Sequence, residues 1–389
     1  MTLFPERRRT SVGVPREIDV GETRVAMVPA VVPQLTRSGL EVVVERGAGT
    51  RAGFSDDAYA SHGARLGSRA DVLEGDIVVR VRGWGVERVR HPVDSRPDQV
   101  VIGMADPFGS LRAVRTAAEA KLVAFALDLV PRITRAQPMD ALSSQATVVG
   151  YRAVLLAADR LPKLFPMLTT AAGTIPPAQV FVVGAGVAGL QAIATARRLG
   201  AVVQAYDVRP AAQEDIESLG ARSVLLPLAP GDAEDPSGYA KELGDAFYRR
   251  QQELLATVVA GVDVVVTTAF IPGAVAPVLI TAGAVAGMHP GSVIVDCAAE
   301  RGGNCELTRR DETVLTENRV SILGPTNLPS TVPYDASLMY AKNVAAFLGL
   351  ITTDGRISLD EQDEIVRATL VTSAGEVVHP RVLEALGDV

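Results

Sequence analysis

A glycine-rich stretch near the middle of the chain has the residue types and the spacing needed to bind a dinucleotide. Gly184, Gly186 and Gly189 form a Gly-x-Gly-x-x-Gly motif between an apolar run and a helical pattern that opens at Val187. The first glycine permits a tight turn, the second lets the backbone approach a pyrophosphate, and the third lets helix and strand pack closely. Free N–H groups in the first helical turn would then hold the pyrophosphate, because the helix dipole favours negative charge there.

An acidic residue closes this pattern. A second apolar run covers residues 201–206 and ends on Asp207. A carboxylate there can accept hydrogen bonds from the adenosine ribose hydroxyls and repels a 2′-phosphate, so NAD(H) is favoured over NADP(H). Arg209 could argue for NADP(H), but we expect it to be a solvated surface residue. With strand, helix, second strand and acid all present, the pattern predicts an NAD(H) site.

A group of polar residues crowds a short stretch just before this pattern. They are Arg132, Gln137, Asp140 and Ser143. An amide, a hydroxyl and a carboxylate can bond a carboxamide and ribose hydroxyls, and none of them is needed as a nucleophile. The alternative is an interdomain linker in which Arg132 and Asp140 form a solvated ion pair, and the residues alone do not decide between the two.

The elements that must position these residues alternate between strand and helix, which predicts an α/β protein. We expect two doubly wound Rossmann-like domains with parallel sheets and a cleft between them. The first would contain residues 1–144 and 326–389, with a helix at 337–348 crossing back to it, and the second, nucleotide-binding domain would contain 145–325. Strands are predicted at 11–14, 41–45, 76–81, 100–104, 122–126, 180–183, 201–206, 223–226, 262–267, 292–296 and 320–323. Helices are predicted at 31–38, 57–62, 110–120 and 187–199.

Some segments interrupt this rhythm. Residues 230–250 form a long, charged, turn-rich insert, which fits a flap over a cofactor, although composition alone favours an ordinary variable loop. Residues 354–363 are acidic and polar and suggest a flexible connector. Residues 369–372 and 376–379 flank Ser-Ala-Gly and predict a hairpin.

Composition excludes several classes of protein. The 389 residues carry a net charge of −7, which gives no support for nucleic-acid binding. Cys297 and Cys305 lack metal-type spacing to histidine, so we expect no metal and buried thiols in a reducing compartment. The beginning of the chain lacks the apolar core of a secretory signal, and no apolar run reaches the ~20 residues of a membrane span, so we expect a cytoplasmic chain with no direct membrane insertion. The histidines all lie in loop-like contexts and are expected at the surface: His62, His91, His289 and His379.

Several segments together resemble the alanine dehydrogenase and nicotinamide nucleotide transhydrogenase superfamily. Residues 13–17 (Gly-Val-Pro-Arg-Glu) and 21–26 (Gly-Glu-Thr-Arg-Val-Ala) resemble its beginning. Longer stretches are similar to the NAD(H)-binding α subunit, or domain I, of proton-translocating NAD(P) transhydrogenases: 131–145, 150–154, 296–307 and 327–331. The resemblance extends over nearly the whole chain.

This resemblance implies roles for individual residues. The candidate catalytic residues, which would grip the nicotinamide and its ribose and meet a partner domain, are Arg132, Gln137, Asp140 and Ser143. Tyr239 matches the tyrosine of the family's mobile loop, so the insert at 230–250 becomes a candidate flap that closes when NADH binds. Asp207 matches the ribose-binding carboxylate.

The resemblance also implies a half-enzyme. Because the chain has one convincing dinucleotide fingerprint, NADP(H) would bind to a partner subunit, and another partner would span the membrane and conduct protons. Hydride would pass directly between the two nicotinamides, which needs positioning residues and no acid–base group. The chain would be a homodimer, peripheral on the cytoplasmic face of the membrane through its partners.

Two alternatives remain open. An alanine dehydrogenase could use Arg24 as a carboxylate anchor, but Arg80 and Arg82 stand where those enzymes have a functional lysine, and residues 100–106 contain no histidine where they have a catalytic one. Arginine is a poor proton shuttle at neutral pH, so this alternative is disfavoured. A non-catalytic NAD(H)-binding regulator is the other alternative.

Overall fold

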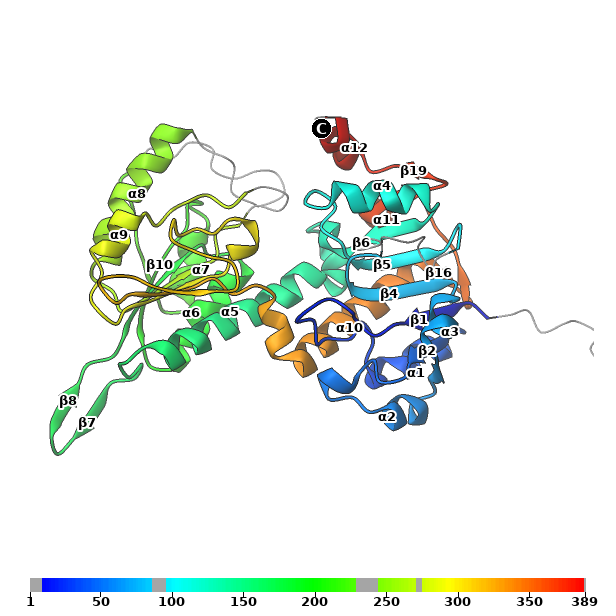
Figure 1. The fold of residues 1–389 in the computed structure, drawn as a ribbon, viewed down its shortest axis with the longest axis horizontal. Helices are drawn as coiled ribbons and strands as arrows, with labels where there is room; N and C mark the ends of the chain where they lie inside the picture. Colours follow the sequence, from blue (N-terminus) through cyan, green and yellow to red (C-terminus); the bar gives the residue numbers. More distant parts are fainter. Residues whose placement is uncertain (1–8, 86–95, 229–243, 271–274, 388–389) are drawn as a thin grey trace, which may run out of the picture. The chain divides into compact units, whose positions relative to one another are not determined.

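The computed structural model describes residues 9–85, 96–228, 244–270 and 275–387, and the chain divides into two compact units (Figure 1). Unit 1 comprises Met1–Gln145 and Pro329–Val389, and unit 2 comprises Ala146–Leu328. Unit 1 therefore carries the blue, cyan and red parts of the colour scale in Figure 1, and unit 2 carries most of the green and yellow.

Unit 1 is built on one sheet, which among the described residues has eight strands in the order β19-β18-β6-β5-β4-β1-β2-β3. These strands are β1 (Ser11–Val14), β2 (Glu41–Glu45), β3 (Arg65–Gly67), β4 (Ile77–Arg82), β5 (Val100–Met104), β6 (Val123–Ala126), β18 (Leu370–Ser373) and β19 (Glu376–Val377). Neighbours from β3 to β6 run parallel, and β18 and β19 add an antiparallel edge. Runs of valine and isoleucine form the parallel strands because helices cover both faces of the sheet.

The alternation of side chains along a strand supplies both faces with a core. Ile77 and Val79 of β4 belong to a cluster that includes Tyr340 and Phe347 of α10, whereas Val78 packs with α4 on the other face. The helices that begin in unit 1 are α1 (Val32–Arg37), α2 (Asp56–Ser61), α3 (Arg69–Leu73), α4 (Leu111–Glu119), α5 (Ala141–Arg160), α10 (Pro333–Ile351), α11 (Glu364–Thr369) and α12 (Pro380–Gly387).

A glycine lets α3 approach the central strand. A Cβ atom on Gly13 in β1 would lie 2.0 Å from the carbonyl oxygen of Val72 in α3. The first residue of the same strand is held by Asp76, whose Oδ2 accepts the N–H of Ser11 at 2.9 Å. The position of β1 is therefore fixed by close backbone contact and by a charged hydrogen bond.

Unit 2 contains a second doubly wound sheet, with seven strands among its described residues in the order β11-β10-β9-β12-β13-β15-β14. They are β9 (Gln179–Val183), β10 (Val202–Tyr206), β11 (Arg222–Ser223), β12 (Val264–Thr267), β13 (Val293–Asp296), β14 (Thr313–Leu315) and β15 (Ser321–Leu323). All neighbours run parallel except β14, which pairs antiparallel with β15.

Helices pack on both faces of this sheet as well. Val180 and Val182 of β9 lie in one cluster with Ile193 of α6, and Phe181 lies in another with Leu255 of α8. The helices that begin in unit 2 are α6 (Val187–Arg198), α7 (Ala212–Ser218), α8 (Asp245–Val259) and α9 (Ala282–Ala286). A hairpin of β7 (Leu168–Thr170) and β8 (Gly173–Ile175) extends away from the sheet of this unit (Figure 1).

Short elements complete the fold. They are the 3₁₀ helices η1 (Pro29–Val31), η2 (Thr50–Ala52), η3 (Leu127–Leu129), η4 (Thr134–Met139), η5 (Ala299–Arg301) and η6 (Leu328–Thr331), and the small hairpin of β16 (Thr352–Thr353) and β17 (Arg356–Ile357). The described helices include none with the length and the apolar content of a membrane span.

The strand orders place a topological switch point in each unit. In unit 2 the chain runs outward from β9 to β10 and β11, then returns to β12 on the other side of β9. In unit 1 the same reversal occurs between β1 and β4. Ligands of open α/β sheets bind beyond the carboxyl ends of the strands at such points.

The prediction of two doubly wound α/β domains with mainly parallel sheets is confirmed. The details differ in three places. The strand expected at 223–226 is reduced to Arg222–Ser223, and the helix expected at 337–348 is longer, covering Pro333–Ile351. The connector expected at 354–363 includes β17, and its last residue, Asp363, caps α11 by accepting the N–H of Ile365 at 2.8 Å. That segment is therefore more ordered than its composition suggests.

Candidate functional site

The three glycines of the fingerprint meet three different spatial demands. Gly184 follows β9 with φ of +96°, and a Cβ there would lie 2.8 Å from Oγ1 of Thr268. A Cβ on Gly189 would lie 1.8 Å from the carbonyl oxygen of Gly184, so only glycine lets α6 pack this closely. A Cβ on Gly186 would meet no atom within 4 Å, which leaves open space before the first turn of α6.

This open space suits the pyrophosphate of a dinucleotide. Gly186 is the N-cap of α6, and Val187, its first residue, is 37% exposed. The first N–H groups of a helix have no partner within the helix, so they can donate to an anion placed here. A Cβ on Gly186 would occupy the space that a phosphate needs, and the residues present therefore fit the group.

Backbone hydrogen bonds hold the turn between the strand ends. The N–H of Gly184 donates to the carbonyl of Tyr206 at 2.8 Å, and the N–H of Thr268 donates to the carbonyl of Val183 at the same distance. The hydroxyl of Thr268 donates to the carbonyl of Gly184 at 3.1 Å. The carboxyl ends of β9, β10 and β12 thus form one rigid edge at the switch point.

Asp207 lies at the end of β10, and its carboxylate is well occupied. Oδ2 accepts the N–H of Ala185 at 2.7 Å, and Oδ1 accepts the N–H of Arg209 at 2.9 Å. The guanidinium of Arg209 also donates, from Nε to Oδ1 at 2.9 Å and from Nη2 to Oδ2 at 3.1 Å. The expectation of a solvated Arg209 is wrong, because Asp207 holds it in a largely buried ion pair.

A polar framework behind this edge was not anticipated from the sequence. Asp296, at the end of β13, is fully buried and accepts hydrogen bonds from Oγ1 of Thr267 at 2.9 Å, the N–H of Cys305 at 2.9 Å and Oγ1 of Thr308 at 2.6 Å. Asn304 exchanges hydrogen bonds with both backbone groups of Ala269, next to Thr268. Polar residues directly after an apolar strand were the available signal.

In unit 1, the candidate residues divide into a capped pair and two exposed side chains. Asp140 precedes α5, and its carboxylate accepts the N–H of Ser143 at 2.8 Å and its hydroxyl at 2.6 Å. Arg132 and Gln137 are exposed on the segment before α5. Asn343 of α10 fixes this segment, because its Nδ2 donates to the carbonyl of Pro138 at 2.8 Å. The structure thus brings Asp140 and Ser143 together.

Buried charges lie near the switch point of unit 1. Arg24 donates to both oxygens of Glu22 and, through Nη1, to Oε1 of Gln145 at 2.7 Å. Burial alone would raise the pKa of Glu22, but the hydrogen bonds and the charge of Arg24 outweigh it and lower the pKa to about 2. Burial raises the pKa of Glu17 to about 7, although its Oε1 accepts the N–H of Val81 at 2.6 Å. Arg24 therefore already has a carboxylate partner within the chain.

Several remaining candidates fall elsewhere. Tyr239 and most of the insert predicted at 230–250 lie outside the described residues, as does His91. His379 is 7% exposed, which contradicts its predicted surface position, because the ring packs edge-on against Phe108. Within the described ranges, histidine, cysteine and acidic side chains nowhere gather in threes as a metal site requires.

The cysteines are free thiols. Cys305 is buried and Cys297 is partly exposed. Burial raises the pKa of Cys305 to about 11 and raises the pKa of Cys297 further. Both thiols therefore stay protonated and unreactive at neutral pH.

Comparison with known proteins finds relatives along almost the whole chain. The N-terminal domain family of alanine dehydrogenase/PNT matches residues 13–149, and the corresponding C-terminal domain family matches residues 153–380. The chain is 44% identical to the first of the polypeptides that make up NAD(P) transhydrogenase subunit alpha of Rhodospirillum rubrum, covering 95% of this chain and 98% of that protein. It is 26% identical to alanine dehydrogenase of Bacillus subtilis, covering 97% and 94% of the two chains.

Solved structures give the same two kinds of neighbour. A transhydrogenase from Sinorhizobium meliloti superposes with a TM-score of 0.85 at 43% identity, over 95% of this chain and 100% of the other. An L-alanine dehydrogenase superposes with a TM-score of 0.81 at 26% identity, over 97% and 99%.

Proposed function

Because this chain belongs to the alanine dehydrogenase/PNT family, we propose that it is the NAD(H)-binding subunit of a proton-translocating NAD(P) transhydrogenase. The observation that carries the proposal is its end-to-end similarity to the alpha-subunit polypeptide of the Rhodospirillum rubrum transhydrogenase. The open N-terminus of α6 and the carboxylate of Asp207 at the end of β10 support the nucleotide-binding role.

Unit 2 would hold the adenosine half of NAD(H). Gly184 shapes the turn, Gly186 and Val187 admit the pyrophosphate, Gly189 keeps α6 close, and Asp207 faces the ribose. The bound nucleotide supplies a hydride from C4 of its nicotinamide, which passes directly to the nicotinamide of NADP⁺ on a partner subunit. No oxygen or nitrogen changes its protonation in such a step, so the protein's task is to position the rings and exclude water.

The polar residues of unit 1 would act at the nicotinamide. We assign the binding of the carboxamide and ribose, and the contact with the partner, to Arg132, Gln137, Asp140 and Ser143. The hydrogen bonds from Ser143 to Asp140 support this assignment, because they fix the carboxylate in one orientation at the start of α5. Positioning groups of this kind need rigid support to be effective. Tyr239 would contribute from a mobile loop that closes over NADH.

The partners follow from the same proposal. An NADP(H)-binding subunit and a membrane-spanning, proton-conducting subunit complete the enzyme, and the chain attaches to them at the cytoplasmic face of the membrane. It acts as a homodimer. Conformational change in the complex couples hydride transfer to proton movement, and the chain alone has no transhydrogenase turnover.

An alanine dehydrogenase activity is the second candidate, favoured by the superposition on an L-alanine dehydrogenase. Its site would need an arginine that accepts the substrate carboxylate. Arg24 instead pairs with Glu22 in the buried core, and Arg80 and Arg82 replace the lysine expected from those enzymes. Both observations weigh against amino-acid oxidation.

A reconstitution assay tests the proposal. The purified chain is mixed with an NADP(H)-binding transhydrogenase domain, and NADPH-dependent reduction of the acetylpyridine analogue of NAD⁺ is followed by absorbance. Turnover that requires both components is the expected result. NADH oxidation by the chain alone with pyruvate and ammonia would instead establish the dehydrogenase. NADH binding without either reaction, even with the native partners, would indicate a regulator.

A further inference from the structure

The carboxylate of Asp207 has no remaining acceptor position in the structure. An ionised carboxylate offers about four lone-pair sites on its two oxygens. Oδ2 accepts from the N–H of Ala185 and from Nη2 of Arg209, and Oδ1 accepts from the N–H and from Nε of Arg209. The side chains of Asp207 and Arg209 are only 8% and 18% exposed, so water contributes little to this arrangement.

The guanidinium occupies the place that a ribose would take. A 2′,3′-diol presents two parallel O–H donors to the two oxygens of a carboxylate, and the Nε–H and Nη2–H groups of Arg209 present two parallel N–H donors to the same oxygens. The backbone donors from Ala185 and Arg209 are fixed by the fold. A diol can therefore reach Asp207 only when the guanidinium of Arg209 leaves it.

We propose that Arg209 is a second specificity-determining residue of the adenosine ribose site, which occupies Asp207 in the absence of nucleotide and receives a 2′-phosphate when Asp207 is replaced by a neutral residue. This inference rests on the proposed NAD(H)-binding function. In the native protein the negative charge of Asp207 faces the 2′ position and excludes NADP(H). Without that charge, the guanidinium is no longer held and can donate two hydrogen bonds to phosphate oxygens.

Its position in the chain favours Arg209 over the neighbouring arginines. It lies two residues from Asp207, and its own N–H is bound to Oδ1, so the displaced side chain stays within reach of the ribose. Arg222 donates to Oε1 of Gln204 at 2.5 Å, and Arg197 donates to the carbonyl of Leu219. Both of those guanidinium groups are held away from the carboxylate, and Arg222 provides a matched control.

Calorimetric titration of the full chain tests the proposal. NADH and NADPH are titrated into the wild type, D207N, R209Q, the double variant D207N/R209Q and the control R222Q. The fragments 5′-AMP and 2′,5′-ADP are titrated in parallel, because they report on the ribose site without the nicotinamide. D207S replaces D207N in the series if D207N does not fold.

In D207N, NADPH and 2′,5′-ADP should bind at least about tenfold more tightly than in the wild type, the size expected for a charge-assisted phosphate contact. The double variant should lose this gain, and R209Q should bind NADH as tightly as the wild type or more tightly. R222Q should match the wild type with every ligand.

The outcomes separate the two hypotheses. Equal NADPH affinity in D207N and D207N/R209Q, or loss of NADH binding in R209Q, would overturn the role of Arg209 while leaving the NAD(H) site intact. A wild type that binds neither NADH nor 5′-AMP would overturn the proposed function, and the inference with it.

Discussion

Nη2 of Arg24 lies 2.6 Å from Oε2 of Glu22, and Nε lies 2.8 Å from Oε1, so these two buried residues form a bidentate ion pair. Gln145 accepts a further hydrogen bond from Arg24, and Ser330 donates one to Glu22 at 2.7 Å. Three segments that are far apart in the sequence thus meet around one pair of charges. Such a network specifies a single arrangement because each partner left alone would be a buried, unpaired charge.

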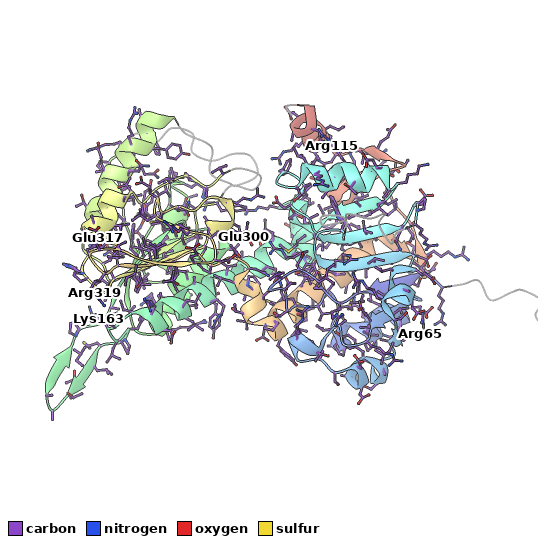
Figure 2. The ribbon with its side chains drawn as sticks, viewed as in Figure 1. Arg65, Arg115, Lys163, Glu300, Glu317 and Arg319 are labelled. Carbon is purple, nitrogen blue, oxygen red and sulfur yellow. The ribbon has the colours of Figure 1, made fainter. Side chains whose placement is uncertain are left out.

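Replacing Arg24 by methionine should strongly destabilise unit 1. The variant R24M leaves the Glu22 carboxylate buried without its cation, which typically costs about 3–5 kcal/mol. Urea unfolding followed by circular dichroism measures the loss. R65M serves as the control, because Arg65 at the edge of the sheet (Figure 2) forms a half-exposed pair with Glu41 worth roughly 0–1 kcal/mol. Equal midpoints for the two variants would contradict the role of the buried pair.

Replacing Glu17 by glutamine should change how stability depends on pH. Burial raises the pKa of Glu17 from 4.5 in the unfolded chain to about 7 in the fold. A carboxyl with a raised pKa favours folding below pH 4.5, and this contribution, at most about 3 kcal/mol, is lost as the pH rises through 7. The free energy of unfolding should therefore fall less between pH 5 and pH 8 in E17Q than in the wild type.

Two comparisons sharpen this pH test. Burial also raises the pKa of Asp128, to about 6, so E17Q should keep part of the wild-type decline. The exposed Glu361 offers a control, and E361Q should reproduce the wild-type curve. Parallel curves for E17Q and the wild type would show that Glu17 is not the group responsible.

The glycines of the fingerprint should separate folding from binding. G189A places a methyl group 1.8 Å from the carbonyl oxygen of Gly184 and should destabilise unit 2 by about 1–3 kcal/mol or more. G186A meets open space and should leave the melting temperature unchanged, yet weaken NADH binding at least about tenfold by blocking the pyrophosphate. Calorimetric melting and titration give both readouts, and unaltered NADH binding in G186A would place the pyrophosphate elsewhere.

Removing Asp140 should affect hydride transfer beyond its effect on stability. D140A removes the acceptor for Ser143 at the start of α5 and should cost about 1 kcal/mol as a lost helix cap. Turnover with the NADP(H)-binding partner should fall by at least about tenfold if Asp140 positions the nicotinamide. The control S55A removes a comparable cap from α2, and a matching loss of turnover there would reduce Asp140 to a structural role.

Periodicity and spacing in the sequence anticipated most of the sheet framework. The apolar runs at 11–14 and 180–183 are strands because β-branched residues suit a sheet covered on both faces. The fingerprint glycines could be assigned to a turn before a helix because their spacing leaves few other conformations. The roles of Gln137 and Tyr239 remain predictions from resemblance.

Side-chain pairing could not be anticipated in the same way. The partner of Arg209 is only two residues away, but a sequence does not show whether a guanidinium turns toward a carboxylate or toward solvent. His379 is buried because Phe108, which is distant in the chain, packs against it. The antiparallel addition of β18 to β6 depends on a long-range contact of the same kind.

The Gly13 contact bears on what the opening motif of this chain records. Its glycine is demanded by the carbonyl oxygen of Val72, and its glutamate, Glu17, satisfies a buried N–H of Val81. Neither requirement involves a substrate. A chain that retains this sheet must retain both residues whichever reaction it catalyses, so the motif is a signature of how the protein assembles, and dehydrogenases and transhydrogenases can inherit it alike.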